Sequence, residues 1–145
     1  MDEYLPVDFS LPLVSLAASV IFLLIGLPLI IHALIRRKGF TRLRDGEQTY
    51  ARRASIRTEF ISAGIAVVAT AICLVMGITG YNTAMSNLVA NVQKEYSPTE
   101  LEIKYWNGSW ATADIAFADG TSYVDAQISM QSAYRPLVEP KMTQD

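Results

Sequence analysis

Residues 36–59 read RRKGFTRLRDGEQTYARRASIRTE and separate two long apolar runs, residues 9–35 and 60–93. The stretch holds eight basic and three acidic residues, although the whole chain has a net charge of −2. Lys and Arg close to membrane spans are retained on the cytoplasmic side. The pattern therefore predicts a two-helix transmembrane hairpin with a cytoplasmic loop and both termini extracytoplasmic. The residues expected to fix this topology are Arg36, Arg37, Lys38, Arg42, Arg44, Arg52, Arg53 and Arg57. They could also attract anionic lipid headgroups, but a role in topology alone is the simpler interpretation.

The two apolar runs are long enough to cross a bilayer as helices. A helix of ~20 residues spans the hydrocarbon, and residues 9–35 carry no formal charge. Residues 1–8 form an acidic tail, whereas a cleavable signal needs a positive start, so this first run is predicted to be retained as a span. Residues 36–59 should form the loop, with a short helix that Asp45 caps and that runs continuously into the second span. The second span is predicted at residues 60–81.

The second span carries small residues at intervals of four. The two stripes are Ser62, Ala66 and Thr70, and then Ala69, Cys73 and Gly77. Such spacing lets two helix backbones approach closely in lipid. The partner could be the first span, through Ser15 and Ser19, or a second copy of the chain, or a larger membrane protein.

Beyond the second span the apolar period continues, so residues 82–96 are predicted to be a helix outside the membrane. Residues 97–131 then alternate in polarity, which predicts a small three-stranded antiparallel β meander. Its turns would be Asn107-Gly108-Ser109, which also matches a glycosylation sequon, and Asp119-Gly120. Leu88 and Val92 of the helix are expected to cover the apolar face. Residues 132–145 should form an extended tail.

The alternation also predicts how the strands pair. Tyr105 is expected to face Ala111, and Ile115 to face Val124, which gathers the apolar residues on one face of the sheet. The opposite face would hold an acidic stripe of Glu102, Asp114 and Asp125. A hard cation or a basic partner surface could occupy that stripe, but a solvated acidic face is the simpler interpretation. Trp106 and Trp110 would be adjacent on the same outer face and could contact a partner.

The last third of the chain resembles a known group of proteins. The segments NVQKEY at residues 91–96, WNGS at 106–109 and ADIAFADGT at 113–121 are similar to those of small two-span membrane proteins of actinobacteria and their phages. The resemblance implies the plasma membrane of a bacterium. It supplies no activity that could be assigned to residues of this chain.

The composition argues against catalysis. The chain has one His and one Cys, both in or beside the apolar runs, and no Gly-rich phosphate loop, so no enzyme and no cofactor are predicted. Nucleic-acid binding is not expected, because the basic loop should lie against a membrane. We expect a non-catalytic accessory or modulatory subunit that binds a larger membrane protein complex, such as a respiratory or transport assembly. The alternative is a self-assembling homo-oligomer or pore.

Overall fold

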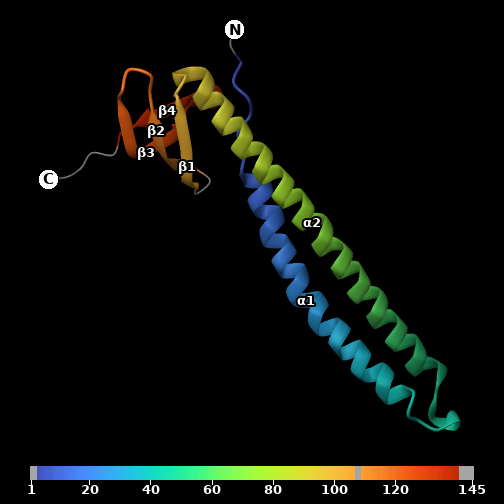
Figure 1. Ribbon diagram of the computed structural model, residues 1–145. Coiled ribbons are helices and arrows are strands. Elements are labelled where there is room, and N and C mark those ends of the chain that lie inside the picture. Colours follow the sequence, from blue (N-terminus) through green and yellow to red (C-terminus); the bar gives the residue numbers. More distant parts are fainter. Residues whose placement is uncertain (1–2, 107–108, 141–145) are drawn as a thin grey trace. The chain divides into compact units, whose positions relative to one another are not determined.

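The computed structural model describes residues 3–106 and 109–140 (Figure 1). The chain divides into two compact units. The hairpin unit is Pro12–Ile78, and the sheet unit combines Met1–Leu11 with Thr79–Asp145. The elements in chain order are α1 Ser10–Phe40, η1 Asp45–Glu47, α2 Tyr50–Tyr96, β1 Glu100–Trp106, β2 Trp110–Ala116, β3 Ser122–Met130, η2 Ser132–Tyr134 and β4 Pro136–Glu139.

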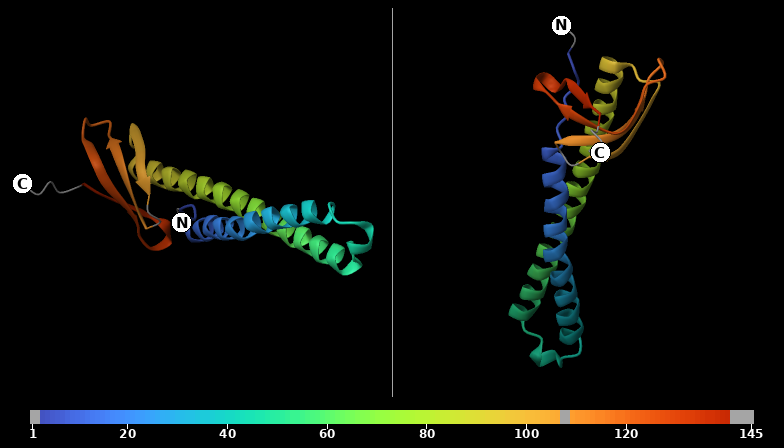
Figure 2. Two further views of the ribbon diagram at one scale, coloured as in Figure 1. Left: turned by 90° about the horizontal axis from the view of Figure 1, so that it is seen from below. Right: turned by 90° about the vertical axis from the view of Figure 1, so that its left-hand side faces the viewer.

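Within the hairpin unit, α1 and α2 lie side by side and antiparallel (Figures 1 and 2). By length and composition, both are helices that could cross a membrane. Helix α1 ends at Phe40 rather than at residue 35, and thus includes the first basic residues of the connection. Helix α2 begins at Tyr50. The predicted helix start at Asp45 is wrong, because residues 45–47 form a 3-10 turn. Just before α2, the Thr49 hydroxyl accepts a hydrogen bond from the Arg52 N–H at 3.4 Å.

The seam between the helices consists of small residues. On α1 the buried residues are Pro12, Ser15, Ser19, Gly26 and Ala33. On α2 the buried or half-buried residues include Ala63, Ala66, Thr70, Cys73 and Gly77. Steps of three and four alternate on α2, which is the pattern of helices that cross at a shallow angle. Of the predicted stripes, Ser62 lies outside this seam because it is exposed, and Ala63 takes its place.

The close approach at this seam depends on two glycines. A Cβ added at Gly26 would lie 3.1 Å from the Cβ of Ala66, and one added at Gly77 would lie 2.6 Å from Cγ of Leu16. The stripe of α2 thus packs against α1 of the same chain. The hydroxyls bond within their own helices, Ser19 to the Leu16 carbonyl at 2.6 Å and Thr70 to that of Ala66 at 2.9 Å.

The sheet unit contains a four-stranded antiparallel sheet in the order β1-β2-β3-β4. The prediction of three strands is wrong, because part of the expected tail forms β4. Positive φ angles at Ala133 and Tyr134 turn the chain back, and Gln131 N–H donates to the Arg135 carbonyl at 2.8 Å. Pro136 opens the strand, a position where its missing N–H is tolerated.

Two bulges change the predicted register. Ile103 faces Ala113 as expected, but Tyr105 faces Thr112 and Trp106 faces Ala111, because the register shifts between Ile103 and Tyr105. A second shift makes Ile115 face Tyr123 rather than Val124. Asp125 sits at this bulge with φ of 54°. Each bulge moves the following side chains to the other face. Part of the predicted first turn, residues 107–108, lies outside the described residues.

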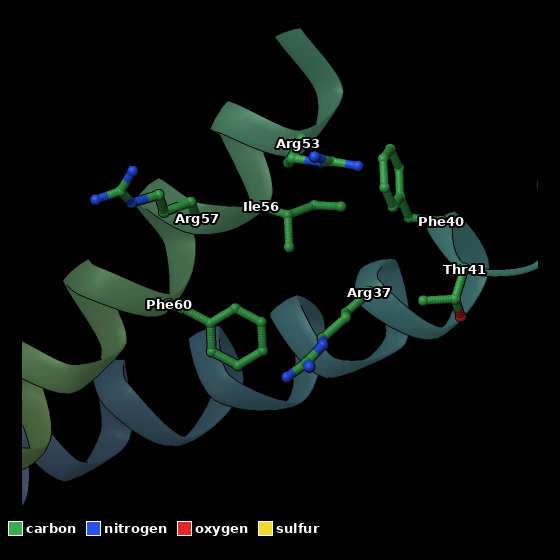
Figure 3. Close-up of a pocket in the computed structure, with 7 residues that line it drawn as sticks. All are labelled: Arg37, Phe40, Thr41, Arg53, Ile56, Arg57 and Phe60. Carbon is green, nitrogen blue, oxygen red and sulfur yellow. The ribbon is translucent and has the colours of Figure 1, made fainter. Parts of the chain in front are cut away.

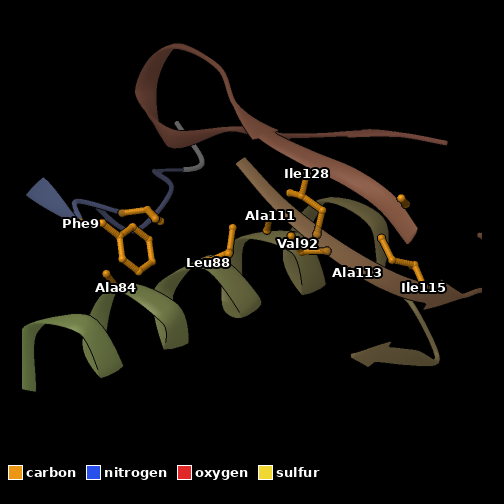
Figure 4. Packing of buried hydrophobic residues seen from close by; sticks show 10 residues of the cluster. Phe9, Ala84, Leu88, Val92, Ala111, Ala113, Ile115 and Ile128 are labelled. Carbon is orange, nitrogen blue, oxygen red and sulfur yellow. The ribbon is translucent and has the colours of Figure 1, made fainter. Parts of the chain in front are cut away.

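The core of the sheet unit lies between the sheet, the end of α2 and the N-terminal segment (Figure 4). Leu88 and Val92 of α2 are fully buried against the sheet, as predicted. Helix α2 ends at Tyr96, the end expected from the sequence. Val7 and Phe9, which the sequence assigned to the acidic tail and to the start of the first span, are buried in the same core.

Candidate functional site

The predicted topology residues all lie at the closed end of the hairpin unit. Arg36, Arg37 and Lys38 occupy the last turns of α1, Arg42 and Arg44 follow it, and Arg52, Arg53 and Arg57 lie in the first turns of α2. Cations at a helix C-terminus are favourable by about 0.3–1 kcal/mol each, and cations at an N-terminus are unfavourable by a similar amount. The arginines at the start of α2 therefore do not stabilise that helix. They add to the positive potential at this end.

A groove of about 380 Å³ opens between the two helices at this end (Figure 3). We call it the arginine groove, and its lining residues are Arg37, Phe40, Thr41, Arg53, Ile56, Arg57 and Phe60. Ile56 lies between the two phenylalanines in Figure 3, and Arg57 points away from it. The Arg37 guanidinium carbon lies 5.9 Å from the Phe60 ring centre, and that of Arg53 lies 5.8 Å from the Phe40 ring centre. These distances are typical of cation–π contacts.

A second groove, of about 270 Å³, shares Phe40 and Ile56 but is lined by Arg36 and Arg52. Here one arginine is neutralised, because Arg36 forms an ion pair with Glu59 and also donates to the Ser55 hydroxyl at 3.3 Å. Across the part of the chain that the structure describes, no carboxylate pairs with Arg37, Arg53 or Arg57. The arginine groove therefore has arginines without a carboxylate partner among the described residues, whereas in the second groove Arg36 is neutralised by Glu59.

His32 also approaches the Arg36–Glu59 pair. Its Nδ1 lies 3.5 Å from Glu59 Oε2, which is too long for a hydrogen bond. That carboxylate oxygen is buried without a hydrogen-bond partner. Glu59 thus holds α2 to α1 mainly through Arg36, and His32 contributes proximity rather than a bond.

The predicted acidic stripe on the outer face of the sheet includes a basic side chain, that of Lys104. Lys104 Nζ lies 2.7 Å from Asp114 Oδ1 and 2.8 Å from Asp125 Oδ1. Hydrogen bonding to Lys104, and then to the Asp125 N–H, lowers the pKa of Asp114, and the two aspartates raise the pKa of Lys104. Glu102 still faces Asp114 as predicted. Among the described side chains no group of three His, Cys, Asp or Glu is placed to hold a metal ion. The alternative of a bound hard cation is therefore not supported.

The predicted outer pair of tryptophans is wrong. The bulge at Lys104 turns Trp106 inward, where its ring lies 4.4 Å from that of Phe9 and packs on the core. Its Nε1 is buried without a hydrogen-bond partner. Tyr105 takes the outer position, is 58 % exposed, and meets Trp110 edge to face at 6.0 Å. The outer aromatic pair is thus Tyr105 and Trp110.

Asn91 has a role that its pattern in the sequence conceals. It looks like a polar residue on the outer side of α2, yet it is 1 % exposed. Its side chain accepts from the Leu5 N–H at 2.9 Å and donates to the Leu5 carbonyl at 2.8 Å and the Tyr134 carbonyl at 3.2 Å. One amide therefore binds the N-terminal segment and the turn before β4 to α2.

Glu95 makes a parallel connection one turn later. Its carboxylate accepts a hydrogen bond from the Tyr4 hydroxyl and forms an ion pair with Arg135, whose Nη2 lies 2.6 Å away. The Tyr4 bond and then the Arg135 bond lower the pKa of Glu95. The partners lie 91 and 40 residues away in the sequence. Local patterns carry no signal for contacts at such separations.

The arginine groove offers positive charge beside apolar carbon, and the outer sheet face offers the exposed ring of Tyr105 beside the half-buried ring of Trp110. The resemblance to small actinobacterial and phage membrane proteins stays a prediction, since no family model, curated protein or solved structure matches the chain.

Proposed function

We propose that this chain is a membrane-anchored, non-catalytic accessory protein that binds a larger membrane protein complex. The observation that carries the proposal is the outward position of the large apolar side chains of the hairpin unit. Val14 is 65 % exposed, Leu24 68 % and Ile65 65 %, while the seam holds small residues. In the most apolar windows of α1 and α2, only 11 % and 17 % of the residues are buried.

The free-energy cost of exposing these apolar side chains to water favours lipid around the two helices. Each half-exposed large apolar side chain left in water costs about 1 kcal/mol relative to burial, so the set on α1 and α2 costs on the order of 20 kcal/mol. A typical domain is stable by only about 5–15 kcal/mol. A bilayer removes this cost. The basic end would then face the cytoplasm and the sheet unit the opposite side, in the plasma membrane of a bacterium as the resemblance implies.

The outer face of the sheet is the proposed docking surface. Tyr105 and Trp110 are in ring contact there, and Val124 at the second bulge is 67 % exposed. Aromatic residues are enriched at the centres of protein interfaces. A partner reached by a chain anchored in the bilayer is itself a membrane protein or is attached to one.

Insertion and orientation can be tested by cysteine labelling in a Cys73→Ser background. Gly46→Cys tests the connection, where an added side chain meets no neighbour within 4 Å, and Thr121→Cys tests the exposed turn before β3. In intact cells an impermeant maleimide should label the Thr121→Cys variant and should reach the Gly46→Cys variant only after the membrane is opened. The reverse pattern, or release of the protein by alkaline carbonate, would remove the basis of the proposal.

Partner binding can be tested by purification in a mild detergent with a tag on the C-terminus. The wild-type chain should bring down a larger assembly at fixed stoichiometry, and the pair Tyr105→Thr with Val124→Thr should release it. Tyr50→Thr is the matched control, because Tyr50 is 87 % exposed but lies at the start of α2. A discrete assembly of this chain alone would contradict the accessory role and favour the homo-oligomer.

A further inference from the structure

We infer that the arginine groove binds the phosphate headgroup of one anionic phospholipid. The inference rests on the proposed membrane location of the hairpin unit and assigns a site within it. The headgroup phosphate would bind Arg37 and Arg53, and the first part of an acyl chain would cover Ile56 between the two phenylalanine rings (Figure 3).

The charge of the groove favours an anion. Guanidinium groups bind phosphate oxygens with paired, charge-assisted hydrogen bonds. The arginines of this groove have no carboxylate partner among the described residues, whereas Arg36 on the other side is engaged by Glu59. The cation–π contacts hold the Arg37 and Arg53 side chains over Phe60 and Phe40 while leaving their N–H groups able to donate. The groove thus has guanidinium donors that no carboxylate of the described residues neutralises.

The apolar floor of the groove favours a lipid over a free anion. Phe40 and Phe60 flank Ile56, whose side chain is only 7 % exposed. Inorganic phosphate would gain nothing from such a surface, and its charge would be desolvated against carbon. A phospholipid places anionic oxygen and methylene groups next to each other, which matches the lining. A volume of about 380 Å³ accommodates a headgroup and the start of one chain, not a whole lipid.

The location also fits this occupant. The groove lies where the apolar runs of α1 and α2 give way to basic residues. Juxtamembrane Lys and Arg attract anionic headgroups at this depth. An arginine at the first turn of α2 is unfavourable for the helix, and a bound phosphate removes that penalty.

Native mass spectrometry of the full chain, released from vesicles of defined composition, tests this inference. The vesicles contain phosphatidylcholine with increasing fractions of phosphatidylglycerol, and the readout is the fraction of chains that retain one phosphatidylglycerol. The pair Arg37→Gln with Arg53→Gln removes the groove donors. The pair Arg42→Gln with Arg44→Gln is the matched control, because these exposed residues carry the same charge outside either groove.

The groove pair should need a roughly tenfold or greater mole fraction of phosphatidylglycerol for half occupancy, and the control pair a change of at most about threefold. An equal loss in both pairs would show diffuse attraction to the basic end and would overturn the site. Equal retention of phosphatidylcholine would overturn the role of charge. Displacement by soluble glycerol phosphate would show a free-anion site instead of a lipid site.

Alkaline carbonate extraction of the same samples separates failure of the inference from failure of the proposed function. Wild-type and variant chains that all resist extraction, but bind lipid alike, would contradict the site alone. A wild-type chain that carbonate releases would contradict both. The pair Arg37→Lys with Arg53→Lys adds a further requirement: it keeps the charge and loses the planar fork, so its affinity should fall between wild type and the Gln pair.

Discussion

Replacing Asn91 by Ala should destabilise the sheet unit strongly. The buried amide of Asn91 makes three hydrogen bonds, two with the backbone of Leu5 and one with the Tyr134 carbonyl. A typical intramolecular hydrogen bond contributes about 0.5–1.5 kcal/mol, and a buried group left without a partner costs more. Three losses amount to about 3–4 kcal/mol. The better helix propensity of Ala returns about 0.5 kcal/mol, so the net loss is about 3 kcal/mol.

The assay is thermal unfolding of the full chain in detergent, followed by tryptophan fluorescence. Trp106 reports on the core, because its ring packs on Phe9. For a unit of about 80 residues, 3 kcal/mol corresponds to a fall in Tm of roughly 10–25 °C. Asn82→Ala is the matched control: Asn82 lies on the same helix but is exposed. Its Tm should change by only a few degrees.

Hydrogen exchange gives a second readout that a general loss of packing would not reproduce. The Leu5 amide is held by Asn91, so it should exchange faster in Asn91→Ala at temperatures where the fluorescence of the sheet unit is still native. If Asn91→Ala melts no earlier than Asn82→Ala, or if Leu5 exchange is unchanged, the reasoning that one amide binds the N-terminal segment to α2 is refuted.

Three further outcomes are expected. Gly77→Val should weaken the hairpin by about 1–3 kcal/mol through overpacking against α1, seen as lost compact migration in SDS gels, whereas Gly64→Val, with open space around it, should migrate like wild type. Lys104→Met should lower the Tm at pH 7, because two aspartates then repel each other, and the deficit should shrink in acid as they take up protons; a deficit that persists at pH 3 would contradict this. The pKa of Glu95 is lowered on folding, so its contribution is complete above its ordinary value of 4.5 and is lost as pH falls through the lower folded value. Because the Tyr4 hydroxyl is the largest cause of that shift, Tyr4→Phe should reduce the acid sensitivity of the Tm between pH 5 and 3, and an unchanged pH profile would argue against the bond.

Charge and period in the sequence are sufficient to predict the two long helices and most of the sheet. The extension of α2 to Tyr96 follows from the apolar period, and the burial of Leu88 and Val92 follows from the need to cover one face of the strands. These features depend on many residues acting together. One residue that departs from the pattern therefore does not change the predicted helix or the predicted buried face.

The bulges depend on single residues, so the alternation of polar and apolar residues does not predict them. Tyr105 and Trp106 are both aromatic, so either could face inward, and only the pairing with β2 decides that Trp106 does. Asp125 adopts a positive φ at the second bulge, which Asp tolerates better than most residues, but nothing in the sequence requires it there. Strand β4 has four residues, too few for a period to show.

The arginine groove could likewise be predicted from the sequence only in part. The excess of positive charge at residues 36–59 is plain in the sequence, and so is its place between apolar runs. Which arginine is neutralised is not, because Glu59 pairs with Arg36 across the two helices. The rotation of each helix about its axis places Arg36 beside Glu59 and places Arg37 and Arg53 in the arginine groove.

The burial of the N-terminal segment in the sheet unit sets an order of events during synthesis. Residues 3–9 are made before α2, but Val7 and Phe9 pack in a core that includes strands made after α2, and the Leu5 bonds span 86 residues. Their burial therefore waits until α2 and the strands that complete this core have been made. A chain that stops short of β2 would therefore be defective around Val7 and Phe9 as well as at its truncated end, because these two residues would lack the strands that complete their core.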